Sequence, residues 1–88
     1  MNKPLNKEIL TLLDTICVNH LSTVVDVVMW LYYEHNIWIS VSIIPYEKHV
    51  MFEYGICTID ESLYQDGVFN SPNEAYEAAI EYTLNNLI

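Results

Sequence analysis

The sequence contains no arginine, and its three lysines stand against 12 acidic residues, which gives a formal net charge of −9. Nucleic-acid binding draws most of its affinity from Lys and Arg side chains that neutralise phosphates and release counterions. A chain with so few cations is repelled by a polyanion, and the same electrostatic reasoning disfavours binding to an anionic membrane surface. We therefore expect neither nucleic acid nor a membrane among its direct partners.

Glycine and cysteine are also scarce, with two residues of each in the chain. Two cysteines are too few for the disulfide framework of a small secreted protein, and free thiols suit a reducing compartment. The N-terminus MNKPLNKEIL lacks the apolar run of a signal peptide. The longest strongly apolar stretch, Val24 to Tyr33, contains Asp26 and is far shorter than the ~20 residues that span a bilayer. We expect a cytoplasmic protein.

Residue patterns typical of metal sites, catalytic sites and phosphate-binding loops are missing as well. Cys17 and His20 are three residues apart and would share a helix face as half of a zinc site, but Cys57 and His49 lack ligand spacing. A Cys–His nucleophilic pair needs a base within reach and an oxyanion donor, and no turn here offers one. The isolated glycines exclude a phosphate-cradling loop. We expect no enzymatic activity, no metal and no cofactor.

What the chain has in excess is apolar material. Apolar residues make up 52% of the 88 residues and charged residues only 17%, whereas an ordinary soluble domain carries about 25% charged residues. A chain of this length forms one domain with a marginal core. We therefore predict a single domain over residues 1–88 whose apolar surplus is covered by a second copy, in a homodimer.

Helix signals stand at both ends of the chain. Apolar residues at helical spacing indicate a first helix from about Lys3 to Asn19, with Pro4 in its first turn. Near the C-terminus, Ser71–Glu74 (SPNE) combines an N-cap serine, a proline at the first helical position and a glutamate at the third. We predict that the helix that follows packs on one face of a sheet. Its apolar stripe consists of Tyr76, Ala79, Ile80, Thr83, Leu84 and Leu87.

The stretch Ser22–Asn36, STVVDVVMWLYYEHN, is the most apolar part of the chain. Thr23 and Asp26 have the spacing of a capping box, and Asn36 tolerates the left-handed conformation that closes a helix. Its four valines leave a strand as the alternative. We predict a helix that is apolar on nearly every side, which belongs in an interior or at an interface and is surrounded by the other elements.

A hairpin is predicted next. Ile37–Ile44 alternates between apolar residues on one face and Trp38 with two serines on the other. A turn at Pro45–Lys48, in which the proline ends the pairing, leads to a second strand from about His49 to Ile59. Gly55 in that strand indicates a bulge or a close backbone approach.

The segment Asp60–Asn70 is less regular, and Asp66-Gly67 in it is a turn signal. A short third strand is predicted near Leu63–Tyr64 or Val68–Phe69. The order of these elements predicts an α+β fold with two N-terminal helices, an antiparallel sheet of two to three strands and a C-terminal helix on one sheet face.

Four side chains are predicted to form the interface. Val25, Met29 and Tyr32 extend the apolar surface around the central helix, and Trp38 lies on the polar face of its strand. Trp and Tyr in such settings are typical interface anchors, although the first helix could cover Trp38 within one chain. If the first helix folds back, one core absorbs the surplus and the argument for a dimer weakens. If it swings away, Val25, Met29 and Tyr32 become the interface.

Carboxylates gather in the C-terminal part. No lysine follows Lys48, and Glu74, Glu77 and Glu81 lie opposite the apolar stripe of the last helix. A solvated face that keeps an apolar protein soluble is the simpler interpretation. The functional alternative is an acidic surface that attracts a basic protein partner.

The start of the last helix, Ser71–Ala79, resembles the last helix of double-stranded-RNA-binding domains, whose fold is α-β-β-β-α. The lysines of that family would fall near Pro72, Asn73 and Tyr76, none of which is basic. The resemblance therefore implies a topology and assigns RNA binding to no residue.

Two further resemblances concern other families. The pattern of Gly67–Phe69, Ser71 and Glu74-Ala75 is similar to antitoxins of the HicB type, which implies a basic toxin as partner. Over most of residues 23–84 the chain resembles small proteins of gut bacteria and their phages, through the junction Trp30–Ile37, the hairpin and the S/T-x-x-EA-x-x-A-I helix. That family implies no activity. We thus predict a self-associating, non-enzymatic interaction module, with an antitoxin-like or nucleic-acid-mimicking inhibitor of a basic protein as the alternative.

Overall fold

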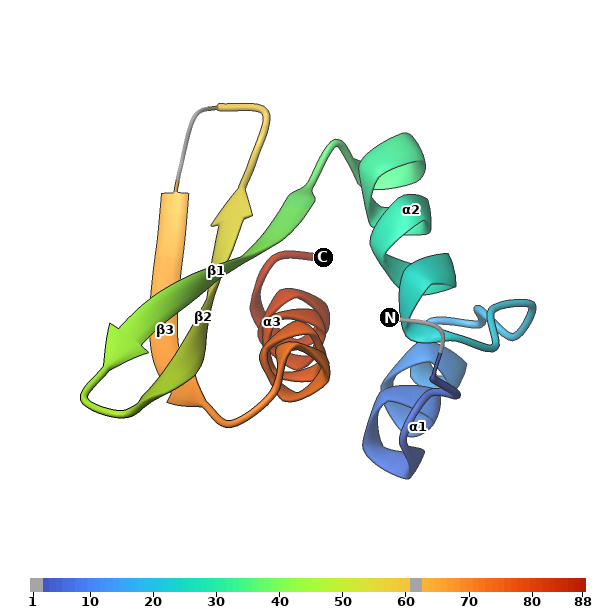
Figure 1. Cartoon of the computed structure of the whole chain (residues 1–88). Coiled ribbons are helices and arrows are strands. Elements are labelled where there is room, and N and C mark those ends of the chain that lie inside the picture. Colours follow the sequence, from blue (N-terminus) through green and yellow to red (C-terminus); the bar gives the residue numbers. More distant parts are fainter. Residues whose placement is uncertain (1–2, 61–62) are drawn as a thin grey trace.

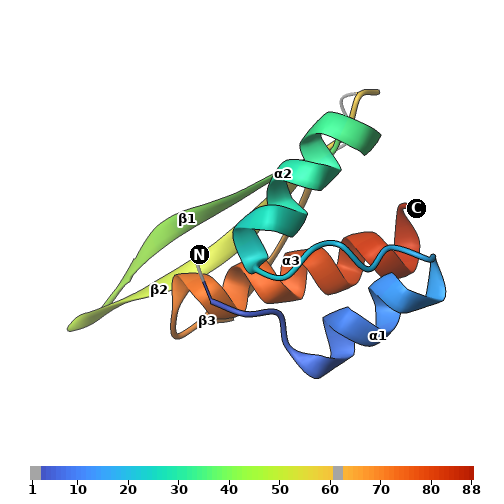
Figure 2. The same cartoon turned by 90° about the vertical axis from the view of Figure 1, so that its right-hand side faces the viewer.

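The computed structural model describes residues 3–60 and 63–88, which form three helices and one sheet. The helices are α1 (Lys7–Thr15), α2 (Val24–His35) and α3 (Pro72–Asn86), and the strands are β1 (Trp38–Tyr46), β2 (His49–Cys57) and β3 (Leu63–Phe69). The strands pair antiparallel in the order β1-β2-β3, and the helices lie on one side of the sheet (Figures 1 and 2). The predicted α+β fold, with the C-terminal helix on the sheet, is confirmed.

Helix α3 lies between the sheet and the two N-terminal helices (Figure 1). Two of its three alanines, Ala75 and Ala79, are fully buried and let neighbouring elements approach closely. The buried Thr83 satisfies its hydroxyl by donating to the Ala79 carbonyl at 2.8 Å. The prediction that the other elements surround helix α2 is therefore wrong, because α3 is the helix that lies between the sheet and the other two helices.

Helix α1 is shorter than the predicted Lys3–Asn19. Its N-cap is Asn6, while Pro4 lies in an extended segment that bridges to Thr23. At the other end Cys17 takes a left-handed conformation, with φ of 62°, and the Val18 N–H donates to the Leu13 carbonyl at 2.9 Å. The Asn6 cap therefore sets the N-terminal end of α1, and the left-handed Cys17 sets its C-terminal end.

The ends of α2 follow the sequence prediction, and the helix is confirmed over the strand alternative. The Thr23 hydroxyl accepts from the Asp26 N–H at 3.2 Å, and the Asp26 carboxylate accepts from the Thr23 N–H at 3.1 Å. This is the reciprocal bonding of a capping box. Asn36 closes the helix in the left-handed conformation, with φ of 55°.

The hairpin extends further at its tip than predicted, whereas β2 ends at Cys57 and not at Ile59. Pro45 does not end the pairing, because it lies opposite Val50 inside β1 and the ladder continues to Tyr46 and His49. An edge strand tolerates this proline because its missing N–H faces away from the neighbouring strand. The far half of the hairpin extends past the helices (Figure 2), which leaves Ile43 66% exposed and Val50 48% exposed.

Strand β3 joins the two short segments offered as alternatives into one strand of seven residues. Asp66-Gly67 is not a turn but lies inside this strand, at a β-bulge where the register with β2 shifts. Gly67 supplies the positive φ of 88° that the bulge uses. Gly55 stays in register with both neighbouring strands, so the predicted bulge there is wrong. A Cβ at Gly55 would lie 3.0 Å from the Ser40 Oγ, which is a side-chain atom and not the predicted backbone approach.

Candidate interaction surfaces

Three rings gather where α2 passes into β1. The rings of Tyr32 and Trp38 meet edge to face with centroids 5.2 Å apart, and Tyr32 meets Tyr33 in the same manner at 5.1 Å. The left-handed Asn36 turns the chain so that the end of the helix and the start of the strand come together. Tyr32 is 46% exposed and Trp38 45%. We call Tyr32, Tyr33 and Trp38 the aromatic cluster.

The structure separates the four predicted interface residues into two pairs. Tyr32 and Trp38 are in contact and exposed, whereas Val25 and Met29 are half-buried. Helix α1 folds back onto α3 through the buried Ile9 rather than swinging away. The core thus absorbs part of the apolar surplus, and the surface left for a partner is centred on the aromatic cluster.

Trp38 also begins a row of side chains on the sheet face opposite the helices. The row continues along β1 through Ser40, Ser42, Ile44 and Tyr46, because alternate residues of a strand share a face. Tyr46 is exposed and Ile44 half-exposed. The predicted strand ended at Ile44, so Tyr46 lay outside it, and Ile44 was not assigned to this face. Continuing the alternation past Pro45 would have identified them.

The three predicted acidic residues do not form one free face. Glu74 is exposed and accepts the Asn70 N–H at 3.1 Å. Glu77 instead accepts from the side-chain amides of Asn6 and Asn73, each at 3.0 Å. Glu81 is half-buried. The expectation that Glu77 and Glu81 face open solvent is wrong, since α1 lies across this side of α3.

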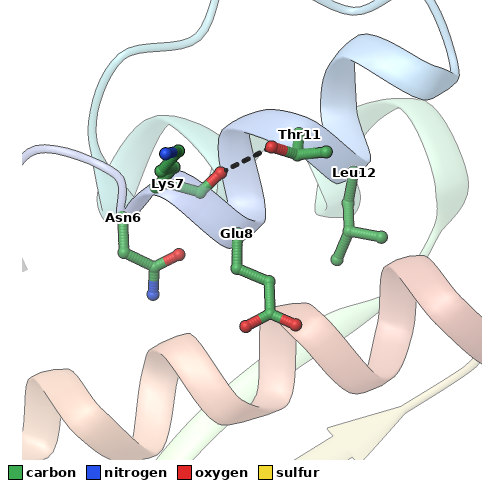
Figure 3. Close-up of a pocket in the computed structure, with 5 residues that line it drawn as sticks. All are labelled: Asn6, Lys7, Glu8, Thr11 and Leu12. Atoms are coloured by element: carbon green, nitrogen blue, oxygen red, sulfur yellow. Dashed lines mark hydrogen bonds between the residues drawn. The ribbon is translucent and has the colours of Figure 1, made fainter.

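Burial raises the pKa of the Glu81 carboxyl above its ordinary value, and the neighbouring Glu8 and Glu77 carboxylates raise it further. Figure 3 shows Glu8 and Leu12 extending from α1 toward the helix below it. These two residues line an open depression of about 590 Å³ together with Asn6, Lys7 and Thr11. The Thr11 hydroxyl donates to the Lys7 carbonyl at 2.9 Å. All five lining residues belong to α1 and its N-cap, so the depression is a shallow surface along one helix.

The candidate metal ligands are not brought together. Within residues 3–60 and 63–88, no group of three or more His, Cys, Asp or Glu side chains is placed to hold a metal ion. Cys17 and Cys57 are free and exposed, the first in the turn after α1 and the second at the end of β2. In the part of the chain that the structure describes, no helix has the length and apolar character to cross a membrane.

Comparisons of the chain with protein-family models, with curated proteins and with solved structures find no match. The functional reasoning therefore depends on the geometry and charge of the chain itself. Among its surfaces, the aromatic cluster combines exposure, ring-to-ring contact and residue types that interfaces favour.

Proposed function

We propose that the protein is a non-enzymatic interaction module that self-associates, with Tyr32 and Trp38 in the interface. The observation that carries this proposal is the exposed edge-to-face contact of these two rings at 5.2 Å. Large aromatic rings gain the most free energy when a partner removes them from water, and they dominate binding energy at interfaces.

Charge supports a second copy of the chain as the partner. Each copy carries a formal net charge of −9, so two copies repel each other unless they meet where carboxylates are few. The segment from Ile37 to Tyr46, which includes Trp38 of the aromatic cluster, contains no charged residue. This neutral surface is where two such chains can approach most closely.

Sedimentation equilibrium tests the proposal on the wild-type chain and two variants, Tyr32→Gln and Trp38→Ser. We expect the wild type to reach twice its mass of 10.3 kDa at high micromolar concentration. Each variant should raise the dissociation constant about tenfold or more, the effect of losing an interface anchor. Leu10→Gln, which changes an exposed apolar residue of α1, is the control and should leave the constant unchanged. A wild type that stays at 10.3 kDa contradicts the proposal.

The alternative function, inhibition of a basic protein, is supported by the net charge of −9 and by the exposed Glu74. It is weakened because Glu77 is already occupied by Asn6 and Asn73. Affinity capture from the source cell tests it. The captured proteins should be basic and should elute as salt rises, since salt screens such contacts. Salt-insensitive capture, or the absence of basic proteins, contradicts this function.

A further inference from the structure

We propose that three tyrosines and a carboxylate at the β3 edge of the sheet form a binding site for a protonated alkyl amine. The residues that line this depression, of about 360 Å³, are Tyr54, Leu63, Tyr64, Gln65, Asp66 and Tyr82. Small-ligand sites have volumes of about 300–1,000 Å³. The proposal does not rest on self-association, because β3 and the strand that carries Trp38 are opposite edges of the sheet.

Three elements bring the tyrosines together. Tyr54 of β2 pairs with Asp66 of β3, and Tyr64 lies two residues before Asp66, so the three side chains share the helix-facing side of the sheet. Helix α3 packs on this side and adds Tyr82, whose ring centroid lies 5.6 Å from that of Tyr64. The depression is therefore formed between the edge of the sheet and the helix that covers it.

The Tyr54 hydroxyl is a polar group that the protein leaves without a partner. Tyr54 is only 5% exposed, and Phe69 lies beside its ring at a centroid distance of 6.1 Å. Within residues 3–60 and 63–88, no group forms a hydrogen bond with this hydroxyl. Buried hydroxyls normally have a hydrogen-bond partner. Because Tyr54 lines the depression, a donor on a bound ligand can supply the missing partner.

The Asp66 carboxylate gives the site its negative charge. One of its oxygens accepts the Gly67 N–H at 2.7 Å, which holds the carboxylate at the bulge, a feature that often re-aims a side chain beside a binding site. None of the described residues that line the depression is basic, so this charge is available to a cation from solution. A charge on an edge strand also hinders pairing with another chain, but that role requires no tyrosines around it.

The electrostatics of the site favour a cation over an anion. Burial raises the pKa of the Tyr54 hydroxyl, and Asp66 and Tyr82 raise it further, so these groups are close enough to interact. The hydroxyl therefore stays neutral at physiological pH, and the faces of neutral tyrosine rings attract cations. The formal net charge of −9 raises the local concentration of cations and repels anions.

These features assign a place to each part of the ligand. The ammonium group donates to the Asp66 carboxylate and to the Tyr54 oxygen, and the alkyl part packs against the rings of Tyr64 and Tyr82. An uncharged alcohol of the same length can donate one hydrogen bond here, but it lacks the attraction to the carboxylate and to the rings. The site should therefore discriminate by charge.

The test is a titration of the full chain with butylammonium chloride and with butanol, followed by NMR of the tyrosine ring signals. We expect butylammonium to shift the signals of Tyr54, Tyr64 and Tyr82 with a dissociation constant in the millimolar range, because an open site offers few contacts. Butanol should bind about tenfold more weakly, since it lacks the charge. Tyr33, which is 70% exposed elsewhere, is the internal control. Equal binding of butanol, or equal shifts at Tyr33, overturns the proposal.

Two variants test the role of the carboxylate. Asp66→Asn keeps an oxygen for the Gly67 N–H and removes the charge, so it should raise the dissociation constant of butylammonium about fivefold or more. Glu47→Gln makes the same change in net charge at the exposed hairpin turn and should leave the constant nearly unchanged. An Asp66→Asn variant that binds as the wild type does overturns the proposal. If this variant does not fold, the titration of the wild type decides.

A further arm of the titration distinguishes two sources of the same chemistry. Nα-acetyl-lysine methylamide presents the ammonium as it occurs on a protein side chain. Tighter binding of this compound than of butylammonium supports a lysine side chain as the ligand, and weaker binding supports a free amine. Failure of both compounds to shift the three tyrosine signals overturns the site.

Discussion

A single side chain, Asn6, both starts α1 and attaches it to α3. Its Oδ1 accepts the Ile9 N–H at 2.8 Å, which caps the helix, and its Nδ2 donates to the Glu77 carboxylate at 3.0 Å. Aspartate is an equally good N-cap and suits the positive end of the helix dipole. It has no donor for Glu77, however, and would place a second carboxylate beside it.

We predict that Asn6→Asp lowers the free energy of unfolding by about 1.5–3 kcal/mol, the range for losing a hydrogen bond to a charged group. Asn6→Ser keeps the cap and removes the donor without adding charge, so its loss should be smaller. Urea unfolding at neutral pH measures both variants. An Asp variant as stable as the wild type would show that the Asn6–Glu77 hydrogen bond contributes nothing to stability.

At the scale of elements, β3 depends on the bulge that makes its edge irregular. Gly67 has a φ of 88°, and a Cβ there would lie 2.0 Å from the Phe69 ring. Both the backbone conformation and the ring therefore resist any larger residue.

We predict that Gly67→Ala lowers the free energy of unfolding by about 2–3 kcal/mol, the sum of left-handed strain and displacement of the ring. Gly55→Ala is the matched control in the neighbouring strand. Its Cβ would meet only the movable Ser40 Oγ at 3.0 Å, so it should cost less than 1 kcal/mol. Thermal unfolding compares the two. Equal losses would mean that neither the positive φ at Gly67 nor the nearby Phe69 ring makes this position more sensitive to substitution than Gly55.

The elements that the sequence predicted best are those whose signals are local. The capping pair in α2, the SPNE start of α3 and the alternation of β1 each act through residues a few positions apart. Pro45 was misread because its tolerance depends on β1 being an edge strand, which is a property of the whole sheet. The bulge at Gly67 likewise depends on its pairing with β2.

The residues of the candidate surfaces also differ in whether local sequence signals predict their exposure. Strand alternation predicted that Trp38 lies on the outer face of its strand, but it left open whether the first helix covers the ring, which is 45% exposed. The covering of Glu77 and Glu81 was not predicted, because it results from α1 folding across α3, and the two helices are far apart in the sequence. Helical periodicity divides a helix into an apolar and a polar side, but it does not show when a second helix covers part of the polar side.

For the whole molecule, the packing of α1 across α3 brings carboxylates together in an already acidic chain. The Glu81 carboxyl has its pKa raised in the fold by burial and by Glu8 and Glu77. Between its unfolded and folded pKa the native state therefore binds more protons than the unfolded state, and stability falls as pH rises through this window. Asp26 acts in the opposite sense. Backbone N–H groups of Ser22 and Thr23 lower its pKa, so its contribution is lost as pH falls through that lowered value.

We predict that Glu81→Gln increases the free energy of unfolding at neutral pH by a few tenths of a kcal/mol, the scale of partly exposed charge interactions. The variant should also lose less stability than the wild type as pH rises from the ordinary pKa of a glutamate to neutrality, because the group whose protonation the fold favours is gone. Glu47→Gln, at the exposed hairpin turn, makes the same change in net charge and controls for general repulsion.

A double-mutant cycle locates the effect at the seam between α1 and α3. Glu8→Gln alone should also stabilise the protein, and combining it with Glu81→Gln should give less than the sum, because each substitution removes the same repulsion. Strict additivity would separate the two carboxylates energetically and assign the pH dependence to the burial of Glu81 and to Glu77. Urea unfolding of the four chains across this pH range distinguishes the cases, and it also shows whether Glu8, which Figure 3 draws extending from α1 toward the neighbouring helix, weakens the attachment of α1 at neutral pH.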